Sequence, residues 1–167
     1  LFPSATVQAG LAPDGQPLPA AQTAHTAYEQ LVGSMFWQDM QPGVLDRDRR
    51  DYDVIDDASL QRARVEDGAL IIGAERYRAL VLPECRALEA ASVDVLLRFV
   101  DDGGLLIAIG ALPAVSVVSD SDAIGELRQC FADGRARQID DAESLPLALA
   151  PIQRVIDAPV PTLHRRI

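Results

Sequence analysis

Two apolar runs separated by an amphipathic stretch constrain the fold of this chain more than any other feature. Residues 78–82 and 105–109 are almost continuously apolar, as in strands that are covered on both faces of a parallel sheet. Between them, residues 88–100 repeat apolar side chains at helical spacing, which predicts a helix. Gly103 and Gly104 follow it and are expected to end it. This order predicts a crossover between two parallel strands.

Further elements are expected before this unit. A helix is predicted from Thr23 to about Met40, because apolar residues recur at helical spacing, and the pair Pro42-Gly43 is expected to end it. A short strand is predicted over residues 52–55, where strand-forming residues lie between aspartates. A short helix is expected to follow over residues 58–64.

The rest of the pattern continues the alternation of strands and helices. An antiparallel ribbon is expected over residues 65–77, with turns at Asp67-Gly68 and near Gly73. Helices are expected over residues 123–131 and 141–149. The predicted fold class is therefore α/β, as a three-layer α/β/α sandwich with a mainly parallel, flavodoxin-like sheet.

Length and charge limit the classes of partner. A chain of 167 residues fits one domain. Its net charge is −10, which disfavours nucleic acid as a partner because phosphate backbones are repelled. No apolar run approaches the roughly 20 residues of a membrane span, so no membrane partner is expected. The chain begins without Met or a signal-peptide pattern, and we expect it to be part of a longer one.

The residues that bind metals most often are scattered along the chain. Cys85, Cys130, His25 and His164 lie far apart and show no metal-ligand spacing. We therefore expect no metal and no other cofactor. The two cysteines are expected to be free thiols in the core, with a disulfide between them as the alternative.

Candidate site residues follow the predicted strands, because ligands of open parallel sheets bind beyond the carboxyl ends of the strands. Asp56, Asp57, Glu84 and Gly110 occupy such positions. One hypothesis pairs Asp56 or Asp57 with Glu84 as general acid and base. The alternative is structural, with Asp57 capping the next helix and Glu84 solvated.

Cys85 also lies at a predicted strand end and could serve as a nucleophile. No histidine lies near it in the sequence to lower the pKa of its thiol, and the neighbouring Glu84 and Glu89 would raise that pKa. The sequence context therefore argues against a reactive thiol at this position.

A family resemblance adds to this interpretation. Residues 77–113, YRALVLPECRALEAASVDVLLRFVDDGGLLIAIGALP, resemble the class I glutamine amidotransferase-like superfamily and its PfpI-type relatives. In that pattern a nucleophilic cysteine and a histidine follow the second strand. Here Gly110 stands at the cysteine position and Ala111 at the histidine position, while Pro113 matches the family's proline. The resemblance implies that the turn is kept and the acyl-transfer chemistry is lost.

A closer resemblance covers nearly the whole chain and rests on the order of five stretches: LFPSA, FWQDM, DYDVIDDASLQRARVEDGALIIGAERYRALVLP, GGLLIAIGALP and LHRRI. This order resembles the amidotransferase-like domain inside large bacterial glycoside hydrolases, above all the α-L-rhamnosidase family. A similar domain serves in the trimeric β-galactosidases. The resemblance implies a domain over residues 1–162 whose first strand is cut, and a following segment that begins at residues 163–167.

The function implied by this resemblance is that of a non-catalytic accessory or scaffolding domain. Its partners would be the catalytic barrel and β-sandwich of the parent chain, a further copy of the chain, or a carbohydrate near Asp56, Glu84 and Gly110. The parent would be a glycosidase; rhamnosidase relatives are often exported, but the compartment of this chain is left open because no leader is present in this sequence. The alternative function is a stand-alone PfpI-like hydrolase or glyoxalase-type enzyme that uses Cys85.

Overall fold

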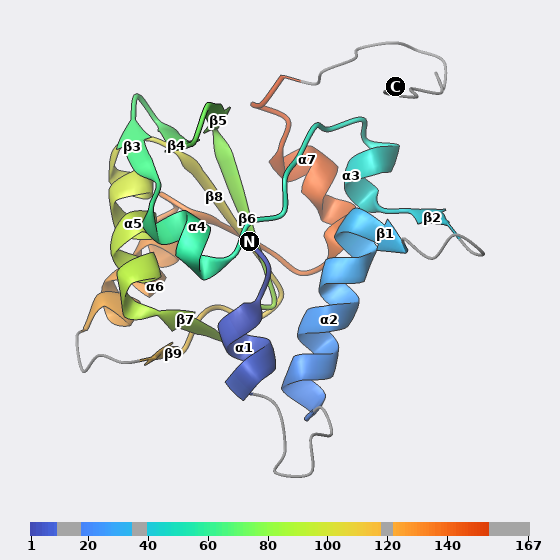
Figure 1. Cartoon of the computed structure of the whole chain (residues 1–167), viewed down its shortest axis with the longest axis horizontal. Coiled ribbons are helices and arrows are strands. Elements are labelled where there is room, and N and C mark those ends of the chain that lie inside the picture. The colour runs from blue at the N-terminus through green and yellow to red at the C-terminus, as the bar shows by residue number, and fades with distance from the viewer. Residues whose placement is uncertain (10–17, 35–39, 118–121, 154–167) are drawn as a thin grey trace.

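A parallel sheet lies at the centre of the computed structural model, which describes residues 1–9, 18–34, 40–117 and 122–153 (Figure 1). It is formed by β6 (Ala79–Pro83), β8 (Leu105–Ile109) and β10 (Arg137–Ile139) in the order β10-β8-β6. Helix α5 (Ala90–Asp101) connects β6 to β8, and α6 (Ala123–Ala132) lies between β8 and β10 in the chain. The predicted parallel pairing of the two apolar runs, and hence an α/β fold, is confirmed.

The other elements surround this sheet. The remaining helices are α1 (Ser4–Ala9), α2 (Pro19–Val32), α3 (Val44–Arg47), α4 (Asp57–Gln61), η1 (Ala142–Ser144) and α7 (Leu145–Ala148). The remaining strands are β1 (Gly33–Ser34), β2 (Gln41–Pro42), β3 (Arg64–Glu66), β4 (Ala69–Ile72), β5 (Glu75–Tyr77), β7 (Ala87–Glu89) and β9 (Val115–Val117). The strand β1 pairs with β2, β4 lies between β3 and β5, and β7 runs parallel to β9.

Helices pack against both faces of the parallel sheet. Side chains of neighbouring strand residues point to opposite faces, and the buried residues accordingly fall into two clusters. Leu80, Leu82 and Leu106 belong to the cluster that contains the buried side of α5 and α6. Ile107 and Ile109 belong to the second cluster, which contains residues of α2, α3 and α7.

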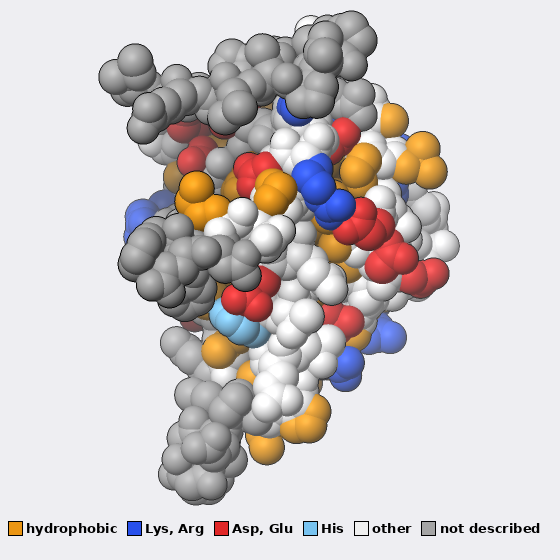
Figure 2. All heavy atoms as spheres, turned by 90° about the vertical axis from the view of Figure 1, so that its right-hand side faces the viewer, with side chains coloured by type: hydrophobic (Ala, Val, Ile, Leu, Met, Phe, Trp, Pro, Cys, Tyr) orange, Lys and Arg blue, Asp and Glu red, His pale blue; other side chains and the backbone are white. Residues whose placement is uncertain are grey.

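The outward surface on the α2 and α3 side is mixed in character. Acidic, basic and single hydrophobic side chains are interspersed there (Figure 2). This is the usual surface of helices whose apolar sides face a core. Among the described residues, no helix has the length and hydrophobicity needed to cross a bilayer.

The predicted ribbon is confirmed, as are its turns. Strands β3, β4 and β5 form an antiparallel sheet. Asp67 and Gly68 both have positive φ, at 51° and 67°, as a two-residue hairpin turn of type I′ requires. Gly73 has φ 62° at the second turn.

The predicted end of helix α5 is also confirmed. Gly103 follows the helix with φ +90°, a conformation that L side chains rarely adopt. At Gly104 a Cβ atom would lie 2.0 Å from Cε2 of the Phe99 ring. The second glycine thus leaves the space in which the fully buried Phe99 packs.

The predicted bounds of the helix after the first loop are wrong at both ends. Helix α2 begins at Pro19, four residues before Thr23, because proline lacks the N–H that the first helical position leaves unpaired anyway. It ends at Val32, before Met40, because Gly33 takes φ +80° and leads into β1. A Cβ atom at Gly33 would lie 2.2 Å from the carbonyl oxygen of Gln41, so the close approach of β2 also requires glycine.

The short strand predicted over residues 52–55 is not formed. The carbonyl of Ile55 accepts a hydrogen bond from the N–H of Phe2 (2.8 Å), and the nitrogen of Leu1 donates to the carbonyl of Val81 (2.7 Å). Leu1 and Phe2 therefore lie between this segment and β6, with one hydrogen bond to each side. Single bonds of this kind do not make a ladder, so neither segment is a strand. Residues 163–167 lie outside the described residues.

Candidate functional site

A cavity of about 390 Å³, lined by both polar and apolar residues, lies at the carboxyl end of the parallel sheet. The strands β6, β8 and β10 end there at Pro83, Ile109 and Ile139. The cavity is lined from the sheet side by Glu84, Ile109, Asp140, Asp141 and Ala142, and from α2 by Pro19, Gln22, Thr23, Thr26, Ala27 and Gln30. Carboxylates, hydroxyls and amides therefore face one another across it, at the edge where open parallel sheets bind ligands.

Glu84 begins the loop after β6 in an unusual conformation. Its φ is 48°, in the left-handed region that non-glycine residues rarely occupy. Its N–H donates to the carbonyl of Ile109 (3.0 Å), and its Oε2 accepts from the N–H of Ala111 (3.2 Å). The side chain is only 16% exposed, with Arg86 3.7 Å from Oε2. The alternative prediction of a solvated Glu84 is therefore wrong.

Gly110 lies at the turn directly after β8, beneath the Glu84 side chain. Its φ is +70°, and a Cβ atom there would lie 2.0 Å from Oε1 of Glu84. Its N–H donates to the carbonyl of Ile139 (2.9 Å), and its carbonyl accepts from Nε2 of Gln138 (2.7 Å). The backbone of Gly110 is thus bonded to β10 and covered by Glu84, with no side chain available for chemistry.

The two aspartates predicted for this site have other partners. Asp56 caps α4 by accepting from the N–H of Ser59 (2.8 Å). Hydrogen bonding with the side chain of Ser59, and then with its backbone, lowers the pKa of Asp56. Asp57 is 4% exposed and accepts from the hydroxyls of Ser4 (2.6 Å) and Ser92 (2.7 Å). The prediction that Asp57 is the cap is wrong, because Asp56 has that role. Neither carboxylate lines the cavity beside Glu84.

The cysteines are free and buried, as predicted, and the alternative of a disulfide is wrong. Cys85 is completely buried, and its burial raises the pKa of the thiol to about 12. The carboxylates of Asp57 and Glu84 raise it further, against the opposing effect of the amino group at Leu1. Burial also raises the pKa of Cys130. Neither environment produces the thiolate that a nucleophile needs at neutral pH.

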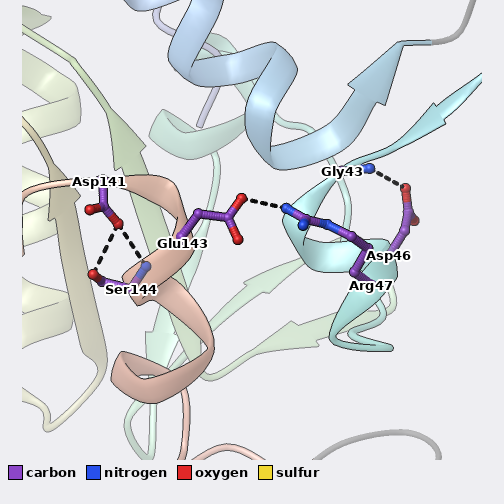
Figure 3. Close-up of polar contacts among 6 residues, drawn as sticks. All are labelled: Gly43, Asp46, Arg47, Asp141, Glu143 and Ser144. Carbon is purple, nitrogen blue, oxygen red and sulfur yellow. Dashed lines mark hydrogen bonds and ion pairs between the residues drawn. The ribbon is translucent and has the colours of Figure 1, made fainter.

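Two acidic residues of the cavity were missed by the sequence analysis. Asp140 and Asp141 follow β10, and their position at a strand end was not recognised because β10 itself was not predicted. Asp141 accepts from the N–H and the hydroxyl of Ser144, both at 2.9 Å, and so caps η1 (Figure 3).

An ion pair connects η1, the short helix after Asp141, to α3. Oε1 of Glu143 in η1 lies 2.5 Å from Arg47, the last residue of α3 (Figure 3). At the start of α3, Asp46 accepts from the N–H of Gly43 (3.3 Å). The cap of η1 thus follows directly on the loop that carries Asp140 and Asp141 into the cavity, and a solvent-exposed ion pair connects η1 to α3.

Neither the protein-family models nor the curated proteins nor the solved structures include a match to the chain. Within the described residues, no three His, Cys, Asp or Glu side chains gather in a group that could hold a metal ion.

Proposed function

We propose that this chain is a non-catalytic accessory domain of a larger glycoside hydrolase of the α-L-rhamnosidase type. In this role it supports a separate catalytic barrel or the contacts between subunits. We further infer the three-layer, flavodoxin-like form of the α/β fold, which is supported by the two buried clusters on opposite faces of the parallel sheet. The cavity at the strand ends, with the carboxylates of Glu84, Asp140 and Asp141 in its lining, would border a carbohydrate.

The conformation of Gly110 is the observation that carries the proposal. In the superfamily that residues 77–113 resemble, the corner after this strand holds the nucleophile. Here that corner has the positive φ of a tight turn, but Gly110 has no side chain and Glu84 fills the space above it. A glycine at this turn can form backbone hydrogen bonds and allow close packing, but it has no side chain that could act as a nucleophile.

The alternative of a PfpI-like enzyme requires a reactive Cys85. The raised pKa of this thiol and its complete burial argue against that role. Reaction with a disulfide reagent at several pH values would decide between the two functions. A Cys130→Ser variant would isolate the signal of Cys85.

We expect Cys85 to react with the reagent only after the protein is unfolded in denaturant, where the same variant gives the full signal. An accessible thiol in the folded protein, with a pKa well below the ordinary value of about 8.5, would support the enzyme and overturn the accessory role.

The accessory role also predicts a lack of turnover. The purified chain of 167 residues should hydrolyse aryl rhamnosides and aryl galactosides no faster than a buffer blank. Turnover that disappears in Glu84→Ala or Asp56→Ala, while the folded state of these variants is intact by circular dichroism, would show that the chain is itself an enzyme.

A further inference from the structure

The cavity at the strand ends combines an apolar lining with a polar one. Its buried lining residues are all apolar: Ala27 of α2, Ile109 of β8 and Ala142 of η1. Its exposed lining residues are polar apart from Pro19, and they come from α2 on one side and from the turn after β10 on the other. A ligand that fits this cavity therefore needs an apolar face and an edge that forms hydrogen bonds.

Helix α2 offers uncharged hydrogen-bonding groups to the cavity. Gln22, Thr26 and Gln30 line it and follow one another at four-residue spacing, so they share one face of the helix. His25 and Glu29 of the same helix contact each other instead (3.4 Å) and do not line the cavity. The described residues include no side-chain partner for Thr26 or Gln30, so both side chains can bond to a ligand.

The opposite side of the cavity offers carboxylate oxygens that are only partly used. Oε2 of Glu84 accepts from the N–H of Ala111, whereas no described residue donates to Oε1. Oδ1 of Asp141 accepts both bonds from Ser144, which leaves Oδ2. Asp140 has no side-chain partner among the described residues. Each of the three carboxylates thus keeps at least one oxygen that could accept a hydrogen bond from a ligand.

The charges around the cavity favour a neutral ligand over an acidic one. None of the described residues that line it is Arg, Lys or His, and Arg86, which lies 3.7 Å from Oε2 of Glu84, is not among them. A carboxylate on a ligand would therefore meet three like charges and no lining cation to pair with. A hydroxyl group has no such cost, because it can donate to a carboxylate and accept from an amide.

We propose that this cavity holds one neutral sugar ring and discriminates against acidic sugars, an inference that rests on the carbohydrate contact in the proposed function. A pyranose ring has the required surfaces, since its C–H groups form an apolar face and its hydroxyls surround the edge. The apolar face lies on the buried lining residues, and the hydroxyls bond to Thr26 and Gln30 on one side and to Glu84 and Asp140 on the other. The volume of about 390 Å³ is within the usual range for small-molecule sites.

The test titrates the complete chain with four sugars and follows the backbone amides by nuclear magnetic resonance. L-Rhamnose and D-galactose are the neutral probes. D-Galacturonate and D-galactosamine are the charged counterparts of galactose, studied at slightly acidic pH, where the first is an anion and the second a cation. We expect both neutral sugars to shift the amides of Thr26, Gly110 and Ala111, and galacturonate to bind more weakly than galactose by roughly tenfold or more.

Three variants assign the binding to the cavity. Asp140→Asn should reduce the difference between galactose and galacturonate, because it removes one of the repelling charges. Thr26→Val should weaken the binding of all the sugars, because valine has the shape of threonine without its hydroxyl. Asp94→Asn is the matched control, since it removes an exposed carboxylate on α5, and it should leave all four affinities unchanged.

Two outcomes would overturn the proposal. One is the absence of shifts with either neutral sugar, and the other is binding of galactosamine alone, which would make the cavity a site for cations. Neither outcome affects the accessory role, which is tested separately by the reactivity of Cys85 and by turnover. Conversely, hydrolysis of an aryl glycoside by the chain would overturn the accessory role, whatever the sugar titrations show.

Discussion

The Glu84 side chain occupies the space that a Cβ atom at residue 110 would need. A Gly110→Ala substitution should therefore destabilise the protein for two reasons. The positive φ of +70° costs an L residue about 1–2 kcal/mol, and the new methyl group displaces the Glu84 carboxylate from its bond to Ala111. Urea denaturation monitored by circular dichroism would measure the loss in free energy of unfolding.

The two effects can be separated by removing the obstructing side chain. In a Glu84→Gly background the clash is absent, so Gly110→Ala should cost only the backbone strain. The two substitutions should thus be coupled rather than additive. Additive losses in the double-mutant cycle would contradict the packing of Glu84 over Gly110.

The buried Asp57 gives a second prediction for a single residue. Asp57→Ala leaves the hydroxyls of Ser4 and Ser92 without their shared acceptor, and should lower the free energy of unfolding by about 3 kcal/mol. Asp57→Asn keeps one acceptor oxygen and should cost less. If the two variants are equally stable in thermal unfolding, the hydrogen bonds from the two serines do not stabilise the fold.

At the scale of elements, the cap of α4 should make stability depend on pH. Hydrogen bonding lowers the pKa of Asp56 in the folded state. Its stabilising effect is therefore present at pH values above the unfolded pKa, and it is lost as the pH falls through the lower, folded pKa.

Asp56→Asn provides the matched control, because asparagine also caps helices but does not titrate. The stability difference between the wild-type protein and Asp56→Asn should be largest near neutral pH and should shrink as the medium becomes strongly acidic. A difference that is constant from neutral pH to pH 3 would rule out this role for the Asp56 charge.

The elements that could be predicted from sequence are those with a long apolar run or a clear helical repeat of apolar residues. β6, α5 and β8 were recognised because five-residue apolar runs flank a twelve-residue amphipathic helix. The strands β7, β9 and β10 have three residues each. Three residues are too few to show the apolar pattern by which a strand is recognised in a sequence. Their pairing depends on the neighbours that the fold provides, which local sequence does not contain.

The residues of the candidate site could be predicted only where the strand before them could be predicted. Glu84 and Gly110 were placed at strand ends because β6 and β8 were recognised, whereas Asp140 was missed together with β10. Asp56 and Asp57 were assigned to a strand that does not form. The contact of Glu84 with Gly110 joins residues 26 positions apart, and it depends on the positive φ of both, which the sequence suggests only for the glycine.

At the scale of the molecule, the two buried clusters share the strands β6 and β8. Because neighbouring residues of one strand serve opposite clusters, we expect a single cooperative unfolding transition. Leu106→Ala and Ile107→Ala, in adjacent positions but different clusters, should each lower the free energy of unfolding by about 2–5 kcal/mol.

In a denaturant titration of either variant, the far-ultraviolet circular dichroism and the aromatic signal should change at the same denaturant concentration. Separate transitions, one sensitive to Leu106→Ala and the other to Ile107→Ala, would show instead that the two sides of the sheet unfold independently.

The packing of Glu84 onto Gly110 also limits which side chains residue 110 can carry. A cysteine or serine installed at residue 110 by a single mutation would place its Cβ atom 2.0 Å from Oε1 of Glu84. To make room for it, the Glu84 side chain would have to turn away or be replaced by a smaller one. A reactive side chain at residue 110 thus depends on a second residue 26 positions away in the chain.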